Sequence, residues 1–78
     1  MSLGDNMIDS KKMGKRLKEL RKSKGWSQIR MMTETEIDQA LISKFENGER
    51  IPPPETLVIL ADFFDTSTDY ILGRTDKK

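Results

Sequence analysis

Residues 27–52 constrain the fold of this chain more than any other stretch. Ser27 and Asp38 stand where helix N-caps are expected, because their side-chain oxygens can accept bonds from the free amides of a first helical turn. Apolar residues follow each of them at helical spacing. Gly48 comes after the second segment, where a residue that tolerates the left-handed conformation ends many helices. The stretch therefore predicts a short helix, a tight turn and a second helix.

The second of these helices, over residues 39–47, has two contrasting faces. Ile42 and Phe45 are three positions apart and share one face. Short and mostly polar side chains occupy the opposite face: Gln39, Ala40, Ser43 and Lys44. A helix that is anchored by two apolar residues and displays short polar groups has the geometry that fits a DNA major groove.

The same stretch resembles the helix-turn-helix of phage-repressor and xenobiotic-response-element regulators of the Cro/C1 type. The matching residues run without insertion or deletion: Ser27, Gln28, Ile37, Ile42, the run from Ser43 to Gly48, Arg50 and Pro52. The resemblance extends over residues 13–73. It implies an all-α fold, a compact five-helix lambda-repressor-like DNA-binding domain with a helix-turn-helix.

Three residues depart from the pattern of this family. Met32 stands where a small residue usually lets the two helices approach, and Thr35 replaces a usual apolar residue. Glu36 stands at the turn position that is usually glycine. If Glu36 has a positive φ, the missing glycine costs about 1 kcal/mol.

Residues 10–24 form the first predicted helix. One apolar stripe recurs at i, i+4 and i+7, and it consists of Met13, Leu17 and Leu20. Lysine and arginine coat most of the remaining positions. Trp26, just after this helix, is expected to pack beneath the following turn as part of the core.

Two more helices are predicted after the central stretch. Pro54 can occupy the first position of a helix over residues 54–64, with Val58 partly buried at its edge. The core stripe of that helix has four members: Leu57, Leu60, Ala61 and Phe64. Ser67 can cap a last short helix over residues 68–72.

These helices make one domain over residues 10–73. Residues 1–9 show no periodicity and are expected to be a mobile tail, and a natural start at Met7 would leave the first residues as an expression remnant. Residues 74–78 are expected to be a polar C-terminal tail.

The amino-acid content argues against several functional classes. The 78 residues include no cysteine and no histidine, so thiolate ligands and the commonest metal ligand and general base are missing. Ser43 and Lys44 are adjacent, so on a helix they point about 100° apart and cannot act as nucleophile and base on one substrate. We therefore predict no enzyme, no catalytic or metal site, no cofactor and no small-molecule ligand. With no apolar run near the roughly 20 residues of a membrane span, we expect a cytoplasmic protein.

Charge is distributed unevenly along the chain. Residues 1–30 contain nine lysines or arginines against three acidic residues, a balance of +6. Residues 31–78 contain five against ten, a balance of −5. A basic run is most often a solvated helix face, but beside the helix-turn-helix resemblance it favours contact with DNA phosphates.

The expected base contacts come from the helix over residues 39–47. The Gln39 amide can pair with N7 and N6 of adenine, which discriminates between bases by about 1–3 kcal/mol, and Ala40 can touch a thymine methyl group. Ser43 and Lys44 can reach a base edge or a phosphate one turn further on.

The resemblance also implies contacts to the DNA backbone. The residues it implies are Gln28, Asn47 and Arg50, and Arg16 on the basic first helix is a fourth candidate. Gln28 alternatively braces Gln39. Arg21 either adds a phosphate contact, like Arg16, or pairs internally with an acidic residue such as Glu46.

Some apolar residues have no place in the predicted core: Ile29, Leu41, Ile51, Ile59 and Phe63. Several exposed apolar side chains together can form an interaction surface. We expect a weak homodimer through the helix over residues 54–64, the last helix or their turn, with Phe63 and Ile59 at the interface.

These features predict a sequence-specific regulator of transcription that binds double-stranded DNA, most simply a repressor that occupies an operator as a dimer. The alternative is a protein-interaction module of the same fold, an antitoxin or repressor antagonist with weak DNA binding. The acidic second half, Met32 and Glu36 favour that alternative. A repressor would show steep salt dependence of DNA binding, and a partner module would not.

Overall fold

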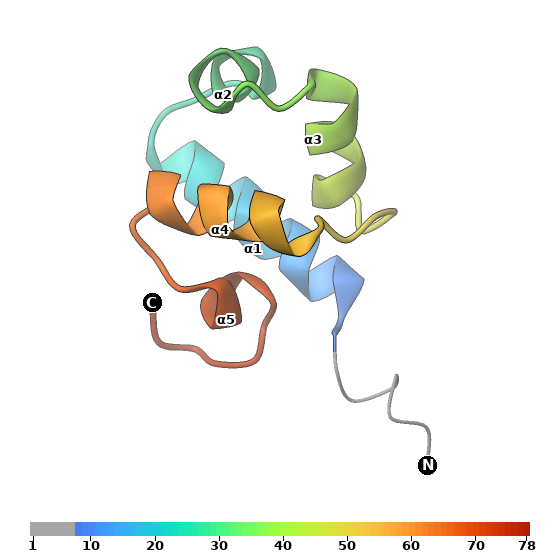
Figure 1. Ribbon diagram of the computed structural model, residues 1–78, viewed down its shortest axis with the longest axis vertical. Helices are drawn as coiled ribbons and strands as arrows, with labels where there is room; N and C mark the ends of the chain where they lie inside the picture. The colour runs from blue at the N-terminus through green and yellow to red at the C-terminus, as the bar shows by residue number, and fades with distance from the viewer. Residues whose placement is uncertain (1–7) are drawn as a thin grey trace.

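The computed structural model describes residues 8–78. Its helices follow the order α1 (Ser10–Ser23), α2 (Gln28–Thr35), α3 (Gln39–Glu46), α4 (Pro54–Phe63) and α5 (Thr68–Ile71), as Figure 1 shows. No residue in this described range is in a strand. The predicted all-α, five-helix fold is confirmed, and the helix ends agree with the predicted ones to within a residue or two.

Most of the helix starts follow from local hydrogen bonds. Ser27, Asp38 and Ser67 each accept a bond from a backbone N–H two or three residues ahead, so the three predicted caps are confirmed. Asp9 caps α1 in the same way, with one carboxylate oxygen accepting from the N–H groups of Lys11 and Lys12 at 3.1 Å. Of the predicted tail, only Ile8 and Asp9 lie in the described range, and Asp9 belongs to the folded domain.

The helices enclose one apolar core. Its buried members come from all five helices and the residue after α4: Met13, Leu17, Leu20, Met31, Ile42, Phe45, Leu57, Leu60, Ala61, Phe64 and Ile71. Every predicted stripe residue of α1 and α4 is among them. Val58 was expected to be partly buried, but 52% of it is exposed, because α4 turns this edge to solvent. Trp26 is half-buried and packs on Phe64, with the ring centroids 5.9 Å apart.

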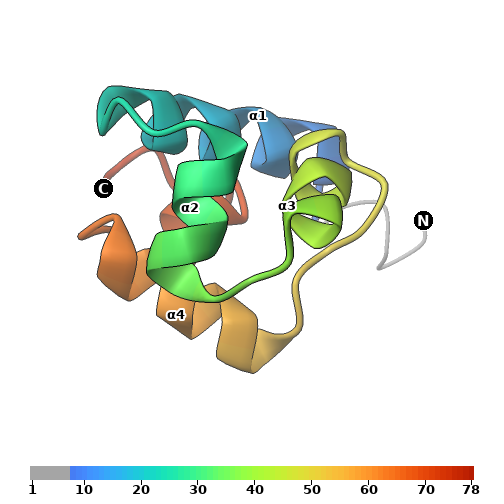
Figure 2. The ribbon, with the colours of Figure 1, turned by 90° about the horizontal axis from the view of Figure 1, so that it is seen from above.

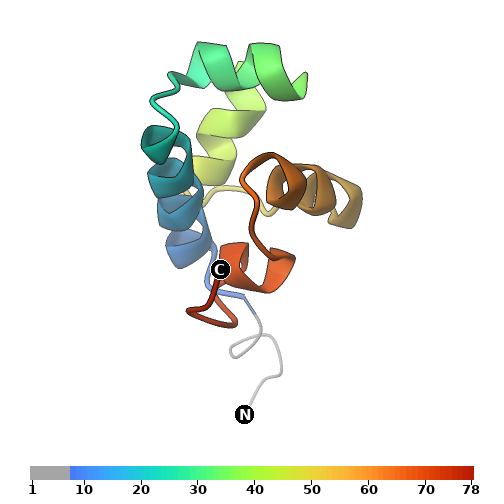
Figure 3. The same ribbon diagram turned by 90° about the vertical axis from the view of Figure 1, so that its left-hand side faces the viewer.

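The arrangement of the helices places α2 and α3 together at one end of the molecule and α5 at the other (Figures 1 and 3). Seen from above, α2 and α3 lie on the same side of α1, with α4 beyond them (Figure 2). One contact sets how closely α1 approaches α3. A Cβ atom at Gly14 would overlap the carbonyl oxygen of Glu46 and would lie 2.6 Å from that of Phe45. Only a glycine therefore allows these two backbones to touch.

None of the helices in the described range is long and apolar enough to cross a membrane.

Candidate nucleic-acid interface

The turn between α2 and α3 is built around Glu36. This residue is left-handed, with φ 61°, and its N–H donates to the carbonyl of Met32 at 2.8 Å. The positive φ considered from the sequence is therefore present. Thr35, the other polar departure, is buried but satisfied, since its hydroxyl donates to the Met31 carbonyl at 2.7 Å and accepts from the Ile37 N–H. The turn therefore accommodates Thr35 and Glu36, which both depart from the family pattern.

Met32 is half-buried and packs against the core. The larger side chain is thus accommodated by partial burial against the core.

A buried ion pair joins α3 to α1. Arg21 on α1 donates to both carboxylate oxygens of Glu46 on α3, at 2.7 and 3.0 Å, and their side chains are 9% and 3% exposed. Arg21 also donates to the Trp26 carbonyl at 2.8 Å, in the turn between α1 and α2. Of the two alternatives for Arg21, the internal pair with Glu46 is the one found.

Gln28 joins this pair from the start of α2. Its side-chain amide donates to the Glu46 carboxylate at 3.2 Å. The brace therefore runs to Glu46 instead of Gln39, and one acidic side chain receives donors from α1 and α2. Because three elements meet at Glu46, the first turn of α2 is held at a fixed position relative to α3.

The outer face of α3 carries the residues expected to contact bases. Gln39, Ala40 and Lys44 are exposed and Ser43 is half-buried, whereas Ile42 and Phe45 are buried beneath them. The predicted division of this helix into a buried face and a polar face is confirmed. These four side chains lie on two successive turns of α3.

The expected backbone contacts differ in their surroundings. Asn47 is exposed just after α3, and its amide donates to Glu49 at 3.3 Å. Arg50 is exposed, and its N–H is held by the Lys44 carbonyl at 3.4 Å. Gln28, Asn47 and Arg50 therefore flank the α2–α3 unit, with Gln28 already bonded to Glu46.

Arg16 has a different role from the expected phosphate contact. Its Nη1 donates to the carbonyl oxygens of Tyr70 and Thr75 at 2.6 Å, and its Nη2 pairs with Asp76 at 2.5 Å. The guanidinium also lies over the Tyr70 ring, 4.2 Å from its centroid. These contacts hold the predicted polar tail against α1, so the guanidinium is not presented to a ligand.

The candidate dimer residues lie on α4. Ile59 is 41% exposed and Phe63 is 36% exposed, and Val58 adds a third exposed apolar side chain to this helix. Phe63 also contacts Trp26 edge-on, with centroids 6.5 Å apart. Leu41 is half-buried against the core, and the remaining unplaced apolar residues, Ile29 and Ile51, are exposed on other segments.

Within residues 8–78, no three carboxylates are grouped as metal ligands.

The sequence profile of the helix-turn-helix family HTH_3 matches residues 17–71, which is most of the chain. The chain belongs to the HTH_3 helix-turn-helix family. The matched region includes the whole of α2 and α3, so the resemblance to Cro/C1-type regulators is confirmed.

Curated relatives of this HTH_3 protein include two transcriptional regulators of Bacillus subtilis. AnsR is 43% identical over 63 residues, which cover 81% of this chain and 54% of AnsR. ImmR is 36% identical over 64 residues, which cover 82% of this chain and 50% of ImmR. The chain thus spans about half the length of the curated relatives it matches.

Solved structures support the same family. The restriction-modification controller protein C.AhdI from Aeromonas hydrophila superimposes with a TM-score of 0.73 at 30% identity, over 81% of this chain and 96% of that one. The DNA-binding domain of S. venezulae BldD gives a TM-score of 0.72 at 23% identity, over 81% and 94%, and shows a shared fold.

Proposed function

We propose that this chain is a sequence-specific regulator of transcription that binds double-stranded DNA, and that it represses by occupying an operator as a homodimer. The observation that carries the proposal is the position of α3. Ile42 and Phe45 anchor this helix in the core, and Gln39, Ala40 and Lys44 are exposed on it. The family membership and the names of the relatives support the same function.

In the proposed complex α3 enters the major groove. Gln39 pairs with adenine, Ala40 contacts a thymine methyl group, and Ser43 and Lys44 reach a base edge or a phosphate. The buried pair of Arg21 and Glu46 sets the angle at which α3 stands on the domain.

Contacts to the DNA backbone come from both sides of α3. Gln28 stands at the start of α2, where free amide groups favour an anion, and Asn47 and Arg50 follow α3. These contacts fix the register on the duplex without reading its sequence. Arg16 is omitted because its guanidinium is engaged by Tyr70, Thr75 and Asp76.

The test is fluorescence anisotropy of the protein with a random duplex pool and with a pool selected from it, each at several salt concentrations. We expect tight binding to the selected pool, a palindromic consensus and a steep loss of affinity with salt. Weak binding that is equal for both pools would contradict the proposal and favour the protein-interaction module.

Two variants separate base contact from backbone contact. Gln39→Ala is expected to relax the preference at one position of each half-site, at a cost of about 1–3 kcal/mol against the consensus. Asn47→Ala is the control, since within residues 8–78 the exposed Asn47 amide bonds only to the Glu49 side chain. It is expected to weaken consensus and random duplexes by the same factor.

A further inference from the structure

The turn after α3 contains the dipeptide Asn47–Gly48, and Asn47 is exposed. An asparagine that is followed by glycine is especially prone to deamidation, because glycine has no side chain to hinder attack by its backbone nitrogen. Asn47 is also one of the residues proposed to contact the DNA backbone. A change of charge at this position would therefore act directly on that contact.

The reaction consumes water and releases ammonia. The Gly48 nitrogen loses its proton and bonds to Cγ of Asn47, and the Cγ–Nδ2 bond breaks as ammonia leaves. The five-membered succinimide that results then adds water at one of its two carbonyl groups, which opens the ring to aspartate or to isoaspartate. Either product has a carboxylate in place of a neutral amide.

The backbone conformation of Asn47 holds the reacting atoms apart. Ring closure requires the Gly48 nitrogen to eclipse Cβ of Asn47 about the Cα–C bond. At ψ −4° that nitrogen eclipses the backbone nitrogen of Asn47 instead. The Gly48 N–H also donates to the Phe45 carbonyl at 3.1 Å, and a hydrogen-bonded amide is protected from losing its proton. The turn must therefore open before the ring can form.

Two further contacts keep the turn closed. A Cβ atom on Gly48 would lie 3.1 Å from Lys11 Cα and from the Ser10 carbonyl oxygen, so the Gly48 backbone packs directly against the start of α1. The side-chain amide of Asn47 donates to Glu49 at 3.3 Å. Opening the turn therefore requires it to separate from the start of α1 and to give up the bond to Glu49.

We propose that Asn47 is a deamidation site whose reaction is controlled by local opening of this turn. Conversion is slow while the turn is closed, and its rate follows the fraction of molecules in which the turn is open. The product carboxylate cannot donate to Glu49 and repels it, so the modification weakens the closed turn irreversibly. DNA-free protein therefore loses DNA affinity as it ages.

The direct test follows Asn47 of the full chain by peptide mapping and mass spectrometry, in buffer and in urea at the same pH. We expect conversion in urea to be at least about tenfold faster than in the folded chain. Asn6, which is followed by methionine, is the internal reference, because a large side chain after asparagine hinders the attack, so in urea it should convert more slowly than Asn47. Equal rates for Asn47 in buffer and in urea, or no conversion of Asn47 in urea, would overturn the proposal.

Two variants separate local opening from global unfolding. Asp9 caps α1, so Asp9→Ala loosens the helix start that contacts Gly48, and it is expected to speed conversion of Asn47 in the folded chain by about fivefold. Gly25→Ala is the matched control, because it strains the backbone at the other end of α1, where no atom lies within 4 Å of the new Cβ. It should leave the rate unchanged. Equal acceleration by both variants, or acceleration by neither, would contradict control by this turn.

The consequence for DNA binding rests on the proposed function. Asn47→Asp is a stable equivalent of the aspartate product, and we expect it to bind duplex DNA more weakly than Asn47→Ala, with the larger difference at low salt. Bound operator should also slow conversion of the wild-type protein, since binding favours the closed turn. Equal affinities of the two variants would remove this consequence. Because the mapping experiment needs no DNA, failure of the deamidation site and failure of the DNA-binding proposal give different results.

Discussion

At the scale of single residues, Glu36 is the clearest case of a local cost accepted by the fold. It holds φ at 61°, where a side chain with a Cβ is disfavoured. We predict that Glu36→Gly raises the free energy of unfolding by about 0.5–1 kcal/mol, after the larger entropy that glycine adds to the unfolded chain. Urea unfolding followed by circular dichroism measures the change.

The matched control is Glu19→Gly, in the middle of α1 and exposed. It adds the same entropy to the unfolded chain but removes no strain, so it is expected to lower the free energy of unfolding by about 0.5–1 kcal/mol. If both variants were destabilised equally, the left-handed turn would carry no strain.

Residue roles were predictable where the partner is close in sequence. The caps Ser27, Asp38 and Ser67 bond to amides two or three residues away, so a local pattern identifies them. The partners of Arg16 are 54 to 60 residues distant, and nothing in the local sequence distinguishes this arginine from a surface one. Its expected role as a phosphate contact came from the basic run alone.

At the scale of helices, the packing of α1 on α3 depends on Gly14. Replacing a helical glycine by alanine usually stabilises a helix, since alanine has the higher helix propensity. Here the new Cβ would overlap the carbonyl of Glu46, and backbone cannot move aside as a flexible side chain can. We predict that Gly14→Ala lowers the free energy of unfolding by about 1–3 kcal/mol, measured by urea unfolding.

Gly25→Ala provides the comparison for Gly14→Ala. Gly25 has φ 73° and no atom within 4 Å of the position a Cβ would take, so its cost is conformational only. We expect this variant to lower the free energy of unfolding by about 1 kcal/mol. A Gly14→Ala variant as stable as the wild type would show that the two helices separate at little cost.

The ion pair of Arg21 and Glu46 joins α1 to α3 in a buried position. Removing one partner leaves the other charge buried, so Glu46→Ala is predicted to lower the free energy of unfolding by about 3–5 kcal/mol. The double variant Arg21→Met with Glu46→Leu is expected to recover part of that loss, because no unpaired charge remains. Thermal unfolding of the single and double variants tests this.

The exposed pair of Arg30 and Glu34 on α2 is the control for the buried pair. Both side chains are more than a third exposed, so Glu34→Ala is expected to cost less than about 1 kcal/mol. If the double variant Arg21→Met with Glu46→Leu were less stable than Glu46→Ala, the buried charges themselves would stabilise the contact between α1 and α3.

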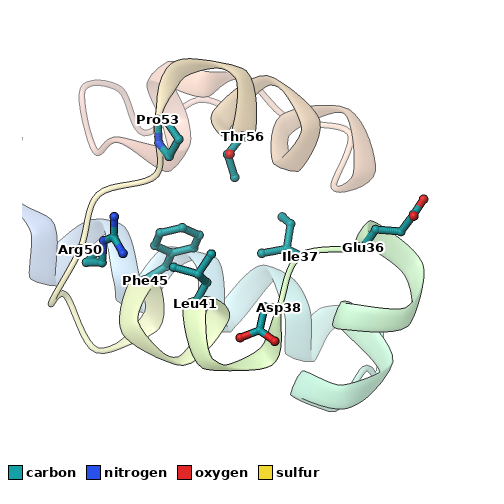
Figure 4. Close-up of a pocket in the computed structure, with 8 residues that line it drawn as sticks. All are labelled: Glu36, Ile37, Asp38, Leu41, Phe45, Arg50, Pro53 and Thr56. Atoms are coloured by element: carbon teal, nitrogen blue, oxygen red, sulfur yellow. The ribbon is translucent and has the colours of Figure 1, made fainter.

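The helices themselves were predictable because each has an apolar stripe, a cap or a proline at its start. What lies between them was not. Gly14 carries no signal of close approach, since a glycine inside a helical pattern has several explanations. A cavity lined by residues between positions 36 and 56 (Figure 4) also arises only when α3 and α4 are packed, and its residues share no sequence motif.

At the scale of the whole molecule, the exposed apolar residues of α4 are the candidate surface for self-association. Regulators with a helix-turn-helix bind two half-sites about 34 Å apart as dimers, which needs a self-complementary surface away from α3. Ile59 and Phe63 are exposed apolar residues on α4, outside the α2–α3 unit. We predict a weak homodimer through them, seen as a sedimentation coefficient that rises with protein concentration.

The variants Phe63→Glu and Ile59→Glu each place a charge in that surface and are expected to leave only monomer. Ile29→Glu makes the same chemical change on α2, where 59% of the isoleucine is exposed, and it should leave the dimer intact. Phe63 contacts Trp26, so tryptophan fluorescence shows whether Phe63→Glu has disturbed the core as well as the dimer. Ile59→Glu repeats the test at a residue without that contact.

On a two-half-site operator the monomeric variants should bind each half-site independently. Sedimentation of the wild type as a monomer at high concentration, with and without DNA, would remove the dimer from the proposal, and operator binding would then rest on single domains.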